Sequence, residues 1–110
     1  MADYTLTPAL LELIGERFKA LSEPARLRVL DALRSGESTV SDLMERTGLG
    51  QANLSKHLQL LHRLGFVARR KDGFYVYYRL ADEDVFQMCD IMCGRIAREM
   101  QSRGAILSGI

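Results

Sequence analysis

The stretch GLGQANLSKHLQLLHRLGFVARRKDGFYVYYRL, residues 48–80, decides the fold because its hydrophobic period changes once along its length. Its first half begins with Leu49-Gly50, which predicts a tight turn. Apolar residues then recur at the spacing of an amphipathic helix, and they are Leu54, Leu58, Leu61 and Leu64. This pattern predicts a helix over about residues 51–64, ended by Gly65.

The second half of the stretch changes to a pattern typical of strands. Residues 66–71 are predicted to form one strand, and residues 74–80, rich in aromatic and β-branched side chains, a second. Asp72-Gly73 between them is a strong signal for a two-residue hairpin loop. A β-hairpin is therefore expected directly after the helix.

Helices are predicted on both sides of this stretch. Upstream, apolar periodicity and capping signals indicate helices over about residues 8–20 and from Ser22-Glu23-Pro24 to Ser35-Gly36, then a short one from Thr39 to Gly48. Downstream, three acids at residues 82–84 suit the first turn of a last helix. The predicted fold is mainly α with a β-hairpin (α+β): a winged helix-turn-helix, ordered helix-helix-helix-helix-strand-strand-helix.

Length and composition limit the class of protein. The 110 residues suit a single domain spanning 1–110, and 47% apolar with 26% charged residues is ordinary for a globular chain. Apolar runs are far too short to span a bilayer, and residues 1–18 do not resemble a secretory signal. Two cysteines make no disulfide framework, so a cytoplasmic location without a membrane partner is expected.

Positive charge is concentrated in the middle of the chain. Residues 51–79 hold six Lys or Arg and one acid, whereas residues 1–50 and 80–110 each have two more acids than bases. No acid occurs over residues 48–71. Such a block is expected of a surface that meets phosphates, although a solvated basic face without a partner would look similar.

The predicted helix over residues 51–64 has the side chains needed to recognise double-stranded DNA. A helix fits the major groove, and Gln or Asn can pair with adenine while Lys meets guanine or phosphate. Its free N-terminal N–H groups can also bind a phosphate. The candidate DNA-contacting residues on this helix are Gln51, Ala52, Asn53, Ser55, Lys56, His57 and Gln59.

The predicted hairpin, called the wing from here on, adds a second candidate contact. Arg69, Arg70 and Lys71 lie beside its glycine turn and can hold the DNA backbone or enter the minor groove. Tyr75 is a further candidate, because at least one of Tyr75 and Tyr77 is expected to face solvent or DNA.

Three segments together resemble the ArsR/SmtB family of prokaryotic winged-helix repressors. They are FKALSEPARLRVL at residues 18–30, residues 51–64 and GFYVYYRL at residues 73–80. The resemblance covers about residues 9–100. The family's recognition helix commonly reads Ser-Gln-Ser-x-x-Ser-Lys/Arg-His-Leu; Gln51, Ser55, Lys56 and His57 match it, whereas Ala52 and Asn53 depart from it.

The resemblance implies how such a protein would work. It implies a homodimer whose interface is formed by the terminal helices, at about residues 8–20 and 82–101. It also implies an operator with two-fold symmetry and release from DNA when an effector binds. The family's two well-known metal sites lack their ligands here, where the matching positions hold Thr39-Val40-Ser41 and, on the last helix, Asp82, Asp84, Arg95 and Arg98.

Cys89 and Cys93 are the candidate effector or redox site. They are spaced i, i+4, which places their Cβ atoms about 5–6 Å apart on a helix, too far for an unstrained disulfide. A thiophilic ion, an oxidant or a bridging sulfur species could use both thiols. Alternatively both cysteines only pack, since they lie on an apolar stripe with Phe86, Ile96 and Met100.

The sequence therefore favours a DNA-binding transcriptional repressor over a protein-interaction module or an enzyme. A winged-helix protein-interaction module without DNA binding would fit an acidic or mixed-charge recognition helix better. A regulator that senses no small molecule or metal also stays open. No catalytic arrangement of side chains indicates an enzyme.

Overall fold

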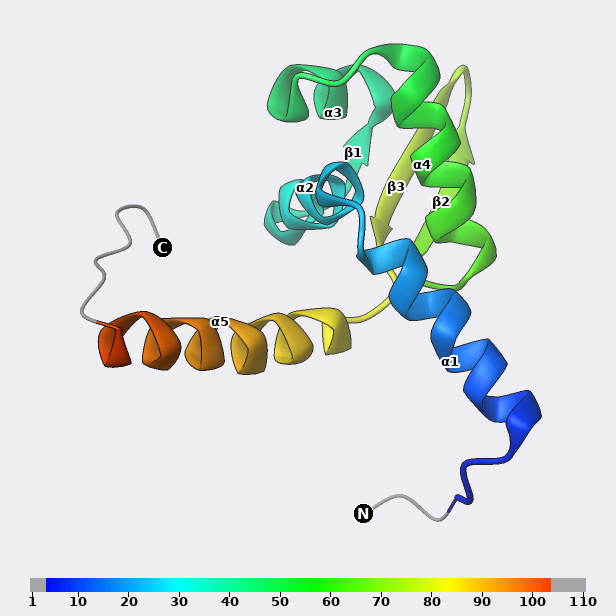
Figure 1. Cartoon of the computed structure of the whole chain (residues 1–110). Coiled ribbons are helices and arrows are strands. Elements are labelled where there is room, and N and C mark those ends of the chain that lie inside the picture. The colour runs from blue at the N-terminus through cyan, green and yellow to red at the C-terminus, as the bar shows by residue number, and fades with distance from the viewer. Residues whose placement is uncertain (1–3, 104–110) are drawn as a thin grey trace.

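Helices pack against one face of a small sheet in the computed structural model, which describes residues 4–103 (Figure 1). The elements are α1 (Pro8–Leu21), α2 (Pro24–Ala32), the 3-10 turn η1 (Leu33–Ser35), β1 (Ser38–Thr39), α3 (Val40–Thr47), α4 (Gln51–Arg63), β2 (Val67–Asp72), β3 (Tyr75–Leu80) and α5 (Asp84–Ser102). The mainly helical winged helix-turn-helix predicted from the sequence is confirmed, with β1 and η1 as additions.

Threonine hydroxyls cap two of the predicted helices, whereas no side chain caps α2. Thr7 and Thr39 cap α1 and α3, and each hydroxyl accepts a backbone N–H of the helix's first turn at 3.2 Å. Gly48 ends α3 with φ 74°, in the left-handed region that glycine adopts without strain. The second helix is shorter than predicted, because α2 ends at Ala32 and η1 carries the chain on to Gly36.

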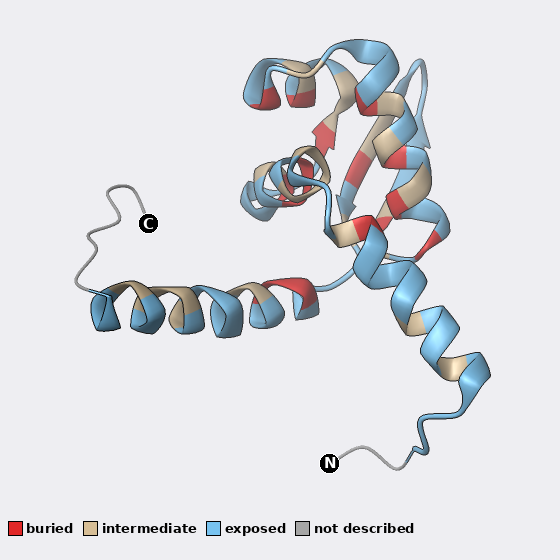
Figure 2. Ribbon diagram, viewed as in Figure 1, coloured by how far each residue is buried: buried red, intermediate tan, exposed pale blue. Residues whose placement is uncertain are grey.

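The core lies between α2, α3, α4 and one face of the sheet. Six of its side chains have no exposed area, and they are Val29, Leu30, Leu43, Leu54, Leu58 and Leu61. Each such side chain contributes about 1.5–3 kcal/mol relative to leaving it in water. Half of these residues belong to the predicted leucine stripe of α4, so the stripe fixes which side of α4 turns inward (Figure 2).

The sheet has a third strand that the sequence did not predict. Its strand order is β1-β3-β2 and both pairings are antiparallel. Ser38 and Thr39 of β1 lie opposite Tyr78 and Tyr77 of β3. Two polar residues give no alternating pattern, and only the long-range pairing to β3 makes them a strand.

The hairpin loop is shifted by one residue from the prediction. Asp72 pairs with Tyr75, so the two loop residues are Gly73 and Phe74 rather than Asp72 and Gly73. Gly73 has φ 62° and no described non-glycine residue has a positive φ. A positive φ at only the first loop position is typical of a type II′ turn, which suits the twist of a hairpin. Phe74 therefore lies at the tip of the wing instead of in the strand.

The two terminal helices extend away from this body in Figure 1. The last helix begins at Asp84 rather than Asp82, since the Asp82 carboxylate accepts the Asp84 N–H at 2.9 Å just before it. Large apolar side chains on α1 and α5 remain exposed, among them Leu11, Leu13, Phe18, Ile91 and Met92. In residues 4–103 no helix is both long enough and apolar enough to cross a bilayer.

Candidate nucleic-acid interface

The outer face of α4 is formed by the residues that the sequence singled out. Gln51, Ala52, Asn53, Lys56 and Gln59 are exposed, whereas Ser55 and His57 are half-buried. Their exposure follows from the burial of Leu54 and Leu58, which turn inward on the same helix. The structure thus gathers the predicted helix contacts along one side of α4, with His57 at its inner margin.

The N-terminus of α4 is open. Gly50 is the N-cap residue, and no side chain caps the helix or places an acid in its first turn. The first N–H groups of a helix carry a partial positive charge and have no partner within the helix. This end of α4 therefore suits an anion better than the N-termini of α1 and α3, which Thr7 and Thr39 cap.

His57 is held by an arginine of α2. The Arg26 guanidinium lies 3.3 Å from His57 Nδ1, and its Nε donates to the Ala20 carbonyl at 2.6 Å. Because arginine has only donors, Nδ1 accepts and the imidazole carries its hydrogen on Nε2. Burial, with a further contribution from the charge of Arg26, lowers the pKa of His57. A DNA contact by His57 stays a prediction, and Nε2–H is the donor that it would use.

The three cations of the wing do not have equivalent surroundings. Arg69 pairs with buried Tyr78 and therefore shares the sheet face against which α4 packs. Lys71, two residues further on, lies on that same face, and both side chains are exposed. Arg69 and Lys71 are thus the wing cations on the α4 side of the hairpin.

Arg70 points to the other face and is already engaged. Its Nε and one terminal nitrogen donate to the two Glu37 carboxylate oxygens at 2.8 and 2.7 Å, and its guanidinium lies 4.5 Å from the centre of the Tyr77 ring. The hydrogen bonds from Arg70 lower the pKa of Glu37. Such bidentate pairs are more directional than a simple ion pair. Arg70 stays a predicted DNA contact, but a phosphate would have to displace Glu37.

The tyrosines of β3 separate into three environments. Tyr78 is buried, Tyr77 is half-buried beneath Arg70, and Tyr75 is 62% exposed. The rings of Tyr75 and Tyr77 lie side by side with centroids 6.4 Å apart. Tyr75 is therefore the tyrosine that faces solvent, as the sequence analysis allowed, and its contact with DNA remains a prediction.

Sequence reasoning missed three residues of this surface. Glu37 and Arg26 are remote from the residues that they hold, and no local pattern signals either contact. Phe74 was assigned to a strand although it lies in the loop. A glycine at the first loop position, followed by any residue, is the type II′ signature that would have identified it.

The two thiols lie outside this surface, on α5. Cys89 is half-buried and packs against the core, whereas Cys93 is exposed, and both are free. Among residues 4–103 no group of three or more His, Cys, Asp or Glu side chains is placed to hold a metal ion. Packing accounts for Cys89 in part, and a sensory role for the pair stays a prediction.

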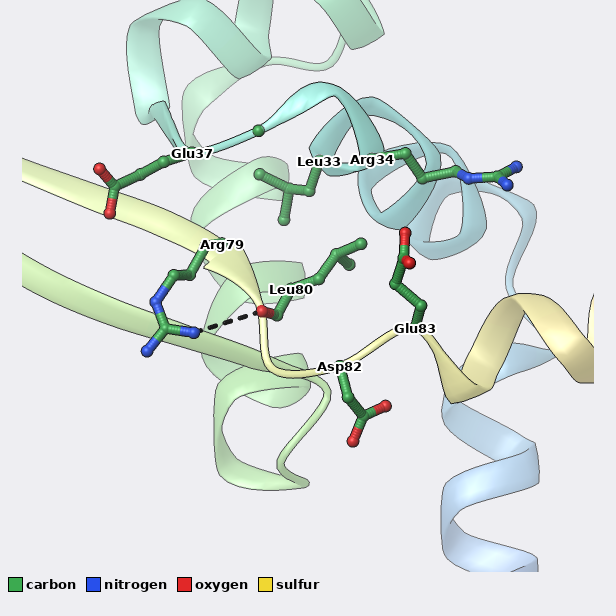
Figure 3. Close-up of a pocket in the computed structure, with 8 residues that line it drawn as sticks. Leu33, Arg34, Glu37, Arg79, Leu80, Asp82 and Glu83 are labelled. Atoms are coloured by element: carbon green, nitrogen blue, oxygen red, sulfur yellow. Dashed lines mark hydrogen bonds between the residues drawn. The ribbon is translucent and has the colours of Figure 1, made fainter.

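A shallow hollow of about 460 Å³ lies where β3 leads into α5. The residues that line it are Leu33, Arg34, Gly36, Glu37, Arg79, Leu80, Asp82 and Glu83. Figure 3 shows that the charged ends point in different directions instead of converging on one point. This hollow therefore lacks the paired, facing groups that acid-base or nucleophilic catalysis needs.

Known proteins resemble this chain both in sequence and in structure. Residues 23–69 match the family described as "Bacterial regulatory protein, arsR family". Over 102 residues, the chain is 35% identical to the HTH-type transcriptional regulator Rv0081 of Mycobacterium tuberculosis (strain ATCC 25618 / H37Rv), covering 92% of this chain and 90% of that protein. The crystal structure of Rv0081 matches with a TM-score of 0.78 over 90% of this chain and all of that chain.

Of two further relatives, one is a homodimeric DNA-binding domain and the other is a repressor. The solution structure of a homodimeric winged helix-turn-helix DNA-binding domain from Mycobacterium bovis is 33% identical, with a TM-score of 0.70, over 91% of this chain and 92% of that one. The transcriptional repressor SdpR of Bacillus subtilis (strain 168) is 33% identical over 63 residues, 57% of this chain and 70% of that protein.

The lowered pKa of His57 predicts a pH-dependent stability. In the unfolded chain, His57 binds a proton near the ordinary imidazole pKa of about 6.5. In the folded chain, burial and the charges of Arg26 and Lys56 outweigh the opposing charge of Glu23 and lower this pKa, so His57 binds a proton only at lower pH. The free energy of unfolding should therefore fall as pH drops below the ordinary pKa. His57→Gln should lose less stability between pH 7 and 5 in urea titrations. His62→Gln, an exposed imidazole on the same helix, is the control; equal pH profiles for the two variants would contradict the assignment.

The two faces of the wing predict unequal roles for neighbouring cations. In a salt series of DNA binding, Lys71→Gln should reduce the log-log slope by about 0.9, the value for one lost phosphate contact. Arg70→Gln should reduce the slope by clearly less, because Glu37 already neutralises that guanidinium. A slope reduced equally by both substitutions would show that Arg70 leaves Glu37 for a phosphate.

Proposed function

We propose that this chain, which belongs to the ArsR family of bacterial regulatory proteins, is a homodimeric transcriptional repressor. It binds a two-fold symmetric operator in double-stranded DNA. In this proposal α4 lies in the major groove and the wing holds the flanking backbone. Residues 1–110 act as a single winged helix-turn-helix domain, in the cytoplasm where the DNA is.

The main support for DNA binding is the chemistry of the outer face of α4. Its first half is uncapped and free of acids, and it presents amide, hydroxyl and ammonium groups to solvent. Gln51 and Asn53 offer the donor-acceptor pairs that match adenine, and Lys56 suits guanine or phosphate. A face that serves only solubility would be expected to mix acids among these groups.

The wing supports the proposal through its position. In Figure 1 the tip of the hairpin and the N-terminal end of α4 lie at the same edge of the molecule. Arg69 and Lys71 are exposed on the α4 side of the hairpin, and Lys56 is exposed on α4 itself. Cations on both elements can bind phosphates of one duplex and so orient the helix over the base edges.

Dimerisation would cover the terminal helices. An apolar hollow of about 190 Å³ between α1 and α5 is lined by Ile14, Arg17, Phe18, Leu21, Phe66 and Met88. Leu11, Leu13, Ile91 and Met92 are also exposed on these two helices, and exposed apolar patches of this kind mark interaction surfaces. The homodimeric Mycobacterium bovis relative supports assigning this surface to a second copy. Two α4 helices would then meet successive major grooves.

The alternative hypothesis is a protein-interaction module, and the composition of the exposed half of α4 argues against it. Protein interfaces are depleted of Lys and enriched in large apolar residues at their centres. The exposed half of α4 has neither property, since Gln51, Asn53 and Lys56 form its surface.

For release from DNA, we propose that a thiophilic ion binds between Cys89 and Cys93. Cys93 is open to solvent while Cys89 packs against the core, so an ion held by both thiolates would connect the surface of α5 with the body. Both thiols lose their protons when such an ion binds. Two α5 helices facing each other in a dimer would bring four thiols together.

A salt series on random-sequence DNA tests the proposed function. The wild-type protein should lose affinity steeply as salt rises, and Lys56→Ala should reduce the log-log slope by about 0.9. Arg63→Ala removes a cation from the other end of α4, where it faces Glu16 at 3.9 Å, and should leave the slope nearly unchanged. Binding that does not depend on salt, or no binding at all, would favour the protein-interaction alternative.

The thiol proposal predicts the response of a double variant. Arsenite, used as the thiophilic probe, should release the wild-type protein from DNA, whereas Cys89→Ser/Cys93→Ser should bind DNA normally and stay bound. The measurement is fluorescence anisotropy of labelled DNA during arsenite titration. Equal release of both proteins, or no release of the wild type, would mean that the two cysteines only pack.

A further inference from the structure

The tip of the wing carries an aromatic side chain with no contact in the fold. Phe74 is 101% exposed, and the adjacent Tyr75 is 62% exposed. Leaving a phenylalanine in water forgoes about 1.5–3 kcal/mol of burial. Folding therefore gives no reason for an apolar residue at this position, where a turn would ordinarily carry a polar one.

The backbone holds Phe74 outward. Gly73 takes the positive φ that the turn requires, and Phe74 follows as the second loop residue between the paired Asp72 and Tyr75. Six residues of strand at about 3.3 Å each carry the tip roughly 20 Å from the base of the hairpin. The side chain thus projects at the far end of a paired ribbon.

The hairpin is braced against the body at its middle, where Arg70 lies opposite Tyr77. Arg70 joins β2 to Glu37 before β1, and its guanidinium covers Tyr77 of β3. A braced ribbon presents its tip in a defined place, so inserting the tip into a partner costs less ordering entropy. On the α4 side of the tip, Arg69 and Lys71 supply positive charge.

We propose that Phe74 inserts between base pairs in the minor groove beside the major groove that α4 occupies, and that it unstacks one base step and bends the DNA. Apolar wedges such as phenylalanine unstack bases in this way from the minor groove, and nearby cations compensate the phosphates. This inference rests on the proposed DNA-binding function and adds a wing contact to it.

Insertion of Phe74 would make binding by the wing depend on the DNA sequence. Pyrimidine-purine steps such as TA and CA/TG unstack at the lowest cost. Operators should therefore carry such a step where the wing crosses the minor groove, outside the bases that α4 reaches. The selection acts through deformability and needs no hydrogen bond from Phe74.

Duplexes enriched from a random-sequence pool by the wild-type protein provide the probe. Three quantities are measured on these duplexes: affinity over a salt series, the bend from energy transfer between end labels, and fluorescence of 2-aminopurine placed at the flanking TA or CA/TG step. The variants are Phe74→Ala and Phe74→Leu, which keeps an apolar wedge. Thermal unfolding of both variants should match the wild type, because Phe74 has no contact to lose.

Phe74→Ala should weaken binding about ten-fold, within the range for removing an aromatic that stacks on a base. The bend and the 2-aminopurine signal should fall towards those of free DNA, while the salt slope stays unchanged because no charge is removed. Phe74→Leu should retain most of the bend and the affinity.

Two outcomes would contradict the proposed insertion of Phe74 between base pairs. Phe74→Ala that binds and bends these duplexes like the wild type would refute it while leaving the proposed function intact. Phe74→Ala that impairs repression in cells but not DNA binding by the purified protein would place a protein partner at the tip instead. A wild-type protein that enriches no duplex would refute the proposed function itself.

Discussion

The burial of three leucines on one side of α4 determines which residues of this helix face solvent. Leu54, Leu58 and Leu61 have no exposed area, and turning α4 about its axis would bring them into water at a cost of several kcal/mol in total. The helix therefore has one rotational setting in the fold. That setting presents Gln51, Lys56 and their neighbours to the outside, so packing energy in the core determines which side chains can meet DNA.

A second constraint acts on the wing. Glu37 and Arg70 are separated by 33 residues, yet they form a two-point contact that joins the segment before β1 to the hairpin. The contact takes one cation out of a basic run and leaves Arg69 and Lys71 on the side of α4. A cluster that looks uniform in sequence thus divides into a cation that braces the hairpin and two that remain exposed.

Local patterns predicted most of the fold. Helical spacing, the threonine caps and Gly48 gave the helices nearly at their observed bounds, because these signals act within one or two turns. The pairing of β1 with β3, the Arg26–His57 contact and the Glu37–Arg70 contact depend on residues distant in sequence and have no local signal. The hairpin loop was misplaced by one residue, since Asp-Gly and Gly-x both describe two-residue turns. For this reason Phe74 was predicted in the strand instead of at the tip of the wing. Of the candidate contacts on α4, Ser55 and His57 are half-buried, which the helical pattern did not indicate.

In the proposed repressor, two copies of α4 meet two successive major grooves of DNA. Hydroxyl-radical footprinting of the whole chain on DNA upstream of its own gene tests this most directly. We expect two protected half-sites related by two-fold symmetry, with centres one helical turn of about 10–10.5 base pairs, or a multiple of it, apart. A single asymmetric footprint, or uniform cleavage at protein concentrations that saturate binding, would contradict it.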